Sequence, residues 1–129
     1  MTAQIKVLQP DINDKGIDHR GAIFSYIPVD AVVEFVYIDT KAGVSRGHHY
    51  HEEFDEYILM VHGEGVYVEY LSDGTTSKII VGPGVCIHIP PYATHTFYPI
   101  TDCKAVSLLT KKWDDCTNPV TPIKSQNLQ

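Results

Sequence analysis

Short runs of β-branched and aromatic residues follow one another along this chain, and glycines, prolines or an Asp-Gly pair separate them. Such runs are typical of strands, and their punctuation is typical of tight turns. No stretch shows a long apolar period of 3.6 residues with helix caps. We therefore predict an all-β antiparallel sandwich or barrel with little or no helix. The expected strands cover residues 5–8, 22–27, 32–40, 56–61, 66–70, 76–81, 85–89, 95–98 and 105–110.

A histidine-rich segment, residues 43–65, contains four of the seven histidines. His49 and His51 are two residues apart, so on a strand their side chains leave the same face. Glu56 opens the next predicted strand, which we expect to fold back beside the first as a hairpin. Two imidazoles and a carboxylate from one wall would suit a divalent transition metal. The alternative is a solvated polar turn, and a register slip of one residue would substitute His48 or Glu52 as ligands.

Two motifs in the sequence resemble those of the cupin superfamily. The first is Gly43-x5-His49-x-His51-x4-Glu56-x6-Gly63, and the second is Gly84-x5-Pro90-x-Tyr92-x2-His95-x3-Pro99. The second motif departs from the cupin pattern at Tyr92 and Pro99. The resemblance implies a jelly-roll barrel, that is, an antiparallel double-stranded β-helix. It also implies His95 as the fourth ligand, approaching from the side opposite His49, His51 and Glu56.

The identity of the metal stays open. Three histidines and one carboxylate leave one or two positions free on a five- or six-coordinate ion, as a reactive site requires. Zinc, nickel, iron and manganese all suit these donors.

A narrower resemblance covers three other stretches. Asp18-x-Arg20-Gly21, the segment Arg46-Gly47-x-His49-Tyr50-His51 and residues 108–115 are similar to cupins of surface-polysaccharide biosynthesis. These include sugar-nucleotide epimerases and ketoisomerases, and the cupin domain of a capsular-polysaccharide epimerase. The resemblance implies an isomerase or epimerase that acts on a nucleotide-linked keto-sugar. We therefore expect the protein to be an enzyme.

Arg46 and several tyrosines are the candidate catalytic residues. Arg46 precedes the first ligand by three residues, and its guanidinium could hold a phosphate or a carbonyl oxygen, or be an ordinary surface cation. An inward tyrosine would supply a phenol near the metal, and the candidates we choose are Tyr37 and Tyr98; Tyr57 and Tyr67 also lie on predicted strands. A metal-bound imidazole cannot also remove a proton. His51 would therefore be the base only if the site is metal-free, as in several similar cupins.

Two other functions use the same residues. The four ligands could hold iron(II) in a dioxygenase. Alternatively, the chain could be a non-catalytic module that binds a small molecule. No role is assigned to His19, His62 or His88.

The bulk composition narrows the partners. A net charge of −6 with only two arginines argues against a nucleic-acid partner. No secretory signal or membrane-length apolar run is apparent, and three cysteines without metal spacing fit a reducing cytoplasm. We expect a single domain over 1–129, with an N-terminal strand and loop (1–20), a barrel (21–113) and a polar C-terminal tail (114–129). We also expect a homodimer, because C2 pairing is the commonest arrangement.

Overall fold

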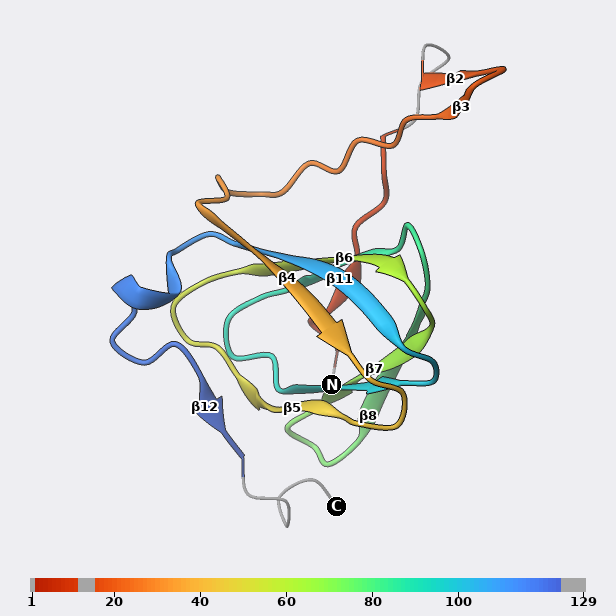
Figure 1. The fold of residues 1–129 in the computed structure, drawn as a ribbon. Coiled ribbons are helices and arrows are strands. Elements are labelled where there is room, and N and C mark those ends of the chain that lie inside the picture. Colours follow the sequence, from red (N-terminus) through yellow and green to blue (C-terminus); the bar gives the residue numbers. More distant parts are fainter. Residues whose placement is uncertain (1, 12–15, 124–129) are drawn as a thin grey trace.

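Two five-stranded antiparallel sheets face each other in a computed structural model of the chain, which describes residues 2–11 and 16–123 (Figure 1). The first sheet has the order β1-β9-β6-β11-β4, and the second has the order β12-β5-β10-β7-β8. A separate two-stranded hairpin joins β2 and β3. The prediction of an all-β antiparallel fold is confirmed.

The strands are short, as the spacing of the turn residues predicts. Their bounds are β1 Lys6–Val7, β2 Ile17–Asp18, β3 Gly21–Ala22, β4 Glu34–Thr40, β5 Arg46–Tyr50, β6 Glu56–His62, β7 Gly65–Tyr70, β8 Thr76–Val81, β9 Cys86–Ile89, β10 His95–Pro99, β11 Cys103–Leu109 and β12 Thr121–Pro122. A 3-10 turn, η2, covers Trp113–Asp115. Within the described ranges there is no α-helix and no helix long and apolar enough to cross a bilayer.

The core lies between the two sheets. Alternate residues of each strand point inward, because side chains on a strand leave opposite faces in turn. The buried cluster consists of Ile5, Ile58, Met60, Tyr67, Val81, Ile87, Ile89, Ala93, Phe97, Cys103 and Ala105. One end of the space between the sheets is left to polar side chains instead, and the candidate site lies there.

The segment 22–27 corrects one strand prediction. It contains apolar and aromatic residues, yet only Gly21 and Ala22 at its start belong to a strand, and Ser25 makes a single bridge to Asp11. The β2–β3 hairpin and the segment that follows it extend away from the two sheets, so no neighbouring strand of the described chain completes a ladder there (Figure 1). Ile23, Phe24 and Ile27 are consequently exposed. The chain returns to the sheets where the Tyr26 hydroxyl donates to the carbonyl of Gly84 and the Val29 amide donates to the Tyr57 hydroxyl.

A bulge interrupts the pairing of β5 with β10. His95 lies opposite His49, but the next residue, Thr96, lies opposite Gly47, so His48 is the additional residue. Gly47 has φ +121° and His48 has φ +57°, which are conformations that ordinary residues rarely adopt. The hydroxyl of Thr96 accepts a hydrogen bond from the amide of His48 at 3.0 Å. Bulges of this kind re-aim side chains, and here the bulge directs His49 into the space between the sheets.

Candidate functional site

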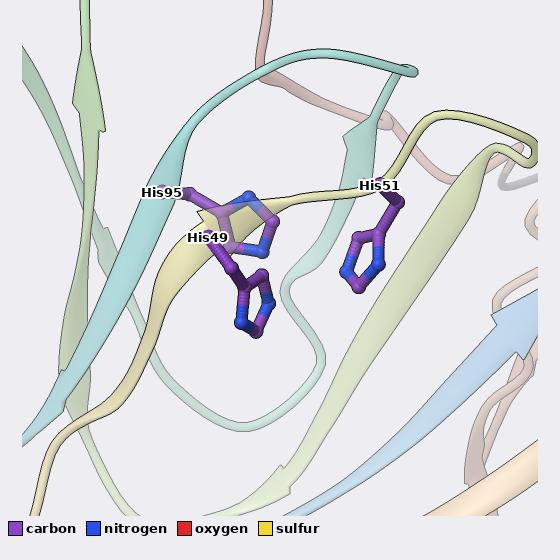
Figure 2. Close-up of side chains that lie close together, drawn as sticks. All are labelled: His49, His51 and His95. Atoms are coloured by element: carbon purple, nitrogen blue, oxygen red, sulfur yellow. The ribbon is translucent and has the colours of Figure 1, made fainter. Parts of the chain in front are cut away.

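Three histidines converge at one end of the sandwich (Figure 2). His49 on β5 and His95 on β10 are directly opposite each other in the ladder, and His51 follows the end of β5. The ring centroids are 4.7 Å apart for His49 and His51, 4.9 Å for His49 and His95, and 5.4 Å for His51 and His95. One nitrogen of each ring lies within 4.8 Å of the others. The structure thus brings together the three imidazoles that the motifs pointed to.

Glu56 reaches the same place from the opposite sheet. Its Oε1 lies 3.3 Å from His51 Nε2, and its Oε2 accepts a hydrogen bond of 2.5 Å from the hydroxyl of Ser107. Glu56 opens β6, which pairs with β9 and β11 and not with β5. The predicted hairpin is therefore wrong, because residues 51–55 cross from one sheet to the other. The three histidines share one wall, and Glu56, rather than His95, faces them from across the barrel.

Main-chain carbonyls fix the orientation of two of the rings. His51 donates its Nδ1 proton to the carbonyl of Pro119 at 2.9 Å, and His95 donates its Nδ1 proton to that of Ala93 at 2.8 Å. A carbonyl oxygen can only accept, so Nδ1 carries the proton in both rings. Nε2 is then the nitrogen free to bind another group, and in His51 it is the atom beside Glu56.

Two of the imidazoles are held neutral by their surroundings. Burial, together with the neighbouring His95 and His51, lowers the pKa of His49 to about 4. Burial also lowers the pKa of His95, against the opposing effect of Glu56. At neutral pH both rings therefore present lone pairs rather than positive charge.

His51 and Glu56 form an opposite case. Burial by itself lowers the pKa of His51, but the hydrogen bond and charge of Glu56 outweigh it, so that the pKa of His51 is raised. Burial by itself raises the pKa of Glu56, but His51, His95 and the Ser107 hydroxyl outweigh it, so that the pKa of Glu56 is lowered. The carboxylate is thus held in its charged form inside the protein, ready to pair with a cation or a proton on His51.

The donor chemistry of this cluster fits a divalent transition metal. Neutral imidazoles and one carboxylate are the ligands that such ions prefer. Histidines that bind metals usually donate their other ring N–H to a carbonyl or carboxylate, as His51 and His95 do here. The three histidines are the residues whose ligand atoms are close enough to hold the ion together, and Glu56, the fourth predicted ligand, lies beside His51 but outside that group.

A cavity of about 460 Å³ opens beside the cluster. Its polar lining includes the four clustered residues, Arg46 at the rim and Tyr67 on the wall; the remaining lining residues are Ile38, Thr40, Ser45, Gly47, Ile58, Phe97, Cys103, Ala105 and Trp113. Trp113 and Glu56 also line an adjoining cavity of about 370 Å³. The volume of the first cavity is in the range of small-molecule sites.

Arg46 lies at the cavity, as its position in the motif suggested. Its Nε donates to Thr40 Oγ1 at 2.8 Å, and its Nη2 donates to the carbonyl of Asp39 at 2.7 Å. A guanidinium has five N–H groups, so three remain after these two bonds. The side chain is held in place and still able to bind an anion.

The two tyrosines chosen from the sequence are not in the cavity. Tyr37 is 57% exposed and lies on the outer face of β4, because Ile38 and Thr40 are the β4 residues that face inward. Tyr98 lies on the outer face of β10, where its hydroxyl is 3.1 Å from that of Tyr70. The structure corrects their placement, since neither side chain lines the cavity beside His49, His51 and His95.

Tyr67 is the tyrosine that lines the cavity. It is buried, its ring stacks on Phe97 with centroids 4.7 Å apart, and its hydroxyl makes no hydrogen bond within the described part of the chain. Burial, and the nearby Glu56, raise its pKa well above the usual value, so the phenol keeps its proton. The sequence placed Tyr67 on a predicted strand, but it did not show which face of that strand points into the barrel.

Trp113 and Ser107 are two further site residues that the motifs did not identify. The indole of Trp113 lines the cavity, and its ring centroid is 6.1 Å from that of His51. The backbone amide of Trp113 donates a hydrogen bond of 2.8 Å to Glu34. Ser107 binds the second oxygen of Glu56 from β11. Both come from segments distant in sequence from the first motif, so no local spacing could have revealed them.

The remaining histidines lie away from the cluster. His88 is 2.7 Å from Asp55 and stacks on Tyr57 with centroids 4.6 Å apart, as expected for a satisfied, partly buried histidine. His19 and His62 are exposed. His48 points to the outer face, where its ring edge contacts Tyr98.

Comparison with known proteins gives one family and many similar folds. The sequence profile of the family described as "Polysaccharide biosynthesis C-terminal domain" matches residues 16–119. No curated protein sequence matches the chain significantly.

Three solved structures illustrate the likeness in fold. A 3,4-ketoisomerase from Helicobacter canadensis is 21% identical with a TM-score of 0.78, over 98% of this chain and 96% of that one. A histidine-to-asparagine variant of the 3,4-ketoisomerase QdtA from Thermoanaerobacterium thermosaccharolyticum, in complex with TDP-4-keto-6-deoxyglucose, is 14% identical with a TM-score of 0.76, over 99% and 94%. A dTDP-4-dehydrorhamnose 3,5-epimerase from Sulfolobus tokodaii is 18% identical with a TM-score of 0.75, over 97% and 80%. The cupin jelly-roll fold is thereby confirmed.

Proposed function

The chain belongs to the polysaccharide biosynthesis C-terminal domain family, and from this premise we propose that it is an isomerase or epimerase of a nucleotide-linked keto-sugar. The observation that carries the proposal is the cavity beside the histidine cluster, which combines an anion-binding Arg46 with groups suited to proton transfer. Similar folds are described as 3,4-ketoisomerases and a 3,5-epimerase, and one of them holds a TDP-linked keto-sugar.

Arg46 would hold the diphosphate. It is the one cationic side chain among the residues described as lining the cavity, and the chain as a whole is acidic. Its guanidinium is fixed by Thr40 and Asp39, so little side-chain entropy is lost when an anion binds. The sugar would then extend from the rim toward the histidines.

Both classes of reaction begin with the same step. A base removes the proton from the carbon next to the ketone, the C–H electron pair forms a C=C bond, and the ketone oxygen takes a proton from a donor. Return of a proton to the same carbon from the other face gives epimerisation. Return to the former carbonyl carbon, with loss of the proton from the neighbouring hydroxyl, gives ketoisomerisation.

The donor set fits a metal, and we propose that His49, His51, Glu56 and His95 hold a divalent ion, with zinc, nickel, iron and manganese as candidates. When bound, such an ion would polarise the ketone of the sugar as a Lewis acid. The four side chains then have their lone pairs engaged and cannot carry the proton. The cavity lining also carries the hydroxyls of Thr40 and Ser45, but a phenol is a stronger acid than an aliphatic alcohol, so we assign Tyr67 the role of proton donor to the ketone oxygen.

If the purified protein contains no metal, His51 becomes the base. His51 and Glu56 both line the cavity, and His51 Nε2 lies 3.3 Å from Glu56 Oε1. The carboxylate stabilises the imidazolium that forms when His51 takes up a proton. The same substrate and the same Tyr67 donor serve in both cases. With a metal bound, however, the base must be a group other than the four clustered side chains.

Elemental analysis and an anaerobic assay test the proposal together. TDP-4-keto-6-deoxyglucose is incubated with the protein in D2O without oxygen, and proton NMR follows deuterium entry next to the ketone and the appearance of product. Exchange and product support the proposal. Turnover that requires oxygen would instead indicate a dioxygenase, and tight binding without exchange would indicate a non-catalytic module.

His51→Ala and the exposed control His62→Ala accompany the wild type. We expect the first to abolish exchange and, if a metal is present, stoichiometric binding of it, and the second to change neither. A His51→Ala protein with wild-type exchange would overturn the assignment of the site.

A further inference from the structure

A C-terminal segment, residues 116–123, lies along the edge of the second sheet next to the histidines, and we name it the strap. Its two-residue strand β12 pairs with β5, with Thr121 opposite Tyr50 and Pro122 opposite His49 (Figure 1). The amide of Ile123 donates to the carbonyl of His48 at 2.8 Å. The strap is therefore part of the wall that carries the site.

Two carboxylates that directly follow His51 in sequence hold the strap. Glu53 accepts a hydrogen bond of 2.6 Å from the amide of Asn118. Glu52 accepts one from the side-chain amide of Asn118 and one of 2.9 Å from the hydroxyl of Thr121. Asn118 and Thr121 are also joined to each other at 2.9 Å. Lys111 binds the other oxygen of Glu53 at 3.0 Å, so both carboxylate oxygens of Glu53 have a partner.

Pro119 lies between these two anchored positions. Its ring limits the backbone, and its carbonyl accepts the Nδ1 proton of His51 at 2.9 Å. A ring nitrogen that donates to a carbonyl determines which tautomer the imidazole adopts. None of the residues that hold the strap lines the cavity. Any effect they have on the chemistry therefore passes through His51. They are Glu52, Glu53, Asn118 and Thr121.

We propose that Glu52, Glu53, Asn118 and Thr121 are positioning residues that lock His51 with its proton on Nδ1 and so direct Nε2 toward Glu56 and the cavity. The tautomer of His51 can be measured in the protein alone. Only the statement that this tautomer helps catalysis rests on the proposed function. Without the strap, His51 would be free to protonate on either nitrogen and to rotate about its side-chain bonds.

The test compares the double variant Asn118→Ala/Thr121→Val with Thr76→Val. Thr76 is exposed on β8, the opposite edge of the same sheet, so it controls for the loss of a threonine hydroxyl at a sheet edge. Nitrogen-15 NMR of the imidazoles in metal-free protein, recorded at a pH at which the His51 ring is neutral, reports which of its nitrogens carries the proton. We expect Nδ1 of His51 to be fully protonated in wild type and Thr76→Val, and partly unprotonated in the double variant.

Zinc affinity is the second readout. Loss of a hydrogen bond that orients a ligating histidine lowers metal affinity by about 10–100-fold, and we expect this for the double variant but not for Thr76→Val. If wild type binds no zinc, zinc is excluded as the metal while the Nδ1 measurement still decides the inference. A folded double variant with Nδ1 protonated as in wild type would overturn the inference, even if its melting temperature fell.

If the double variant does not fold, Thr121→Val alone decides. It removes one of the bonds to Glu52 and keeps Asn118, and we expect a smaller change in the same direction. An unchanged Nδ1 signal in a folded Thr121→Val protein would then count against the strap as the positioning element.

Discussion

The side chains of the cluster differ in protonation although they lie within a few ångströms of one another. His49 and His95 are kept neutral by burial and by neighbouring imidazoles, whereas Glu56 keeps His51 prone to charge. Ser107 supplies the second partner that a buried carboxylate needs. Groups whose environments push their pKa values apart are typical of reactive sites.

Tyr67→Phe tests the proton donor. The phenylalanine keeps the stacking with Phe97 and removes only the hydroxyl, so we expect kcat to fall by about 10²–10⁴-fold with little change in melting temperature. Tyr37→Phe and Tyr98→Phe are the controls, since both hydroxyls lie outside the cavity. Loss of activity in either control, with full activity in Tyr67→Phe, would return the role to the tyrosines chosen from the sequence.

The free energy of unfolding of metal-free protein should fall as the pH drops from 6.5 toward 4. In this window the unfolded chain takes up protons on His49 and His95 more readily than the folded chain, because their folded pKa values are lowered, that of His49 to about 4. Stability rises with pH wherever the unfolded state binds more protons, so it must decrease on acidification here. The opposing contribution of His51, whose folded pKa is raised, is complete below pH 6.5 and adds no slope.

Urea unfolding at several pH values checks this expectation. His49→Gln should show a shallower fall between pH 6.5 and 4 than wild type, and the exposed control His62→Gln should not. Equal slopes in all three proteins would mean that the His49 ring takes up protons in the folded protein as easily as in the unfolded one.

At the scale of elements, the bulge in β5 and the crossing of residues 51–55 build the site. The bulge turns His49 inward, and the crossing carries the chain to the opposite sheet, where Glu56 begins β6. Gly47 allows the bulge. A Cβ at this position would lie 2.7 Å from the carbonyl oxygen of His95 and 2.8 Å from the Cα of Thr96.

Gly47→Ala should therefore be strongly destabilising. The positive φ costs about 1–3 kcal/mol for a residue with a side chain, and the contact with the β10 backbone adds overpacking of about 1–3 kcal/mol. Gly43→Ala is a matched control, because Gly43 also has a positive φ but nothing within 4 Å of the added atom. Denaturant unfolding measures both, and equal losses of stability would show that the approach of β5 to β10 is looser than the structure has it.

The sequence predicted strands far better than it predicted which strands pair. Alternation along a run is a local property, so β8 and β10 lie where expected. Pairing depends on distant segments, and a polar connection such as 52–55 can either turn back or cross between sheets. On β4 both faces carry apolar side chains, Phe35 and Tyr37 against Val36 and Ile38, so the inward face could not be chosen. The histidines were predictable because their spacing is itself local.

For the molecule as a whole, apolar surface gathers at one edge. β4 is the last strand of its sheet and has no partner on its free side among the described residues. Phe35 on this strand is 77% exposed, Tyr37 is 57% exposed, and Val33, which directly precedes β4, is 51% exposed. Large exposed apolar patches and unpaired strand edges are typical of association surfaces.

We expect a homodimer that uses this edge. Phe35→Glu should convert it to a monomer in sedimentation at micromolar concentration, because the charge would be buried in a symmetric interface. Ile80→Glu is the control, since Ile80 is 78% exposed on β8 at the far edge of the other sheet. A monomeric wild type, or a dimer that only Ile80→Glu disrupts, would contradict the expected edge.

β5 pairs with β10 and β12, which both come later in the chain, so the cluster is completed in steps during protein synthesis. His51 is made 68 residues before Pro119, a delay on the order of 3–14 s at about 5–20 residues per second. During that interval the growing chain contains His49 and His51 before His95 is made, and then all three histidines before the strap is made. The complete cluster thus exists only once Pro119 has been made and the chain has folded, and the ion that we propose for it would come from the pool that the folded chain meets.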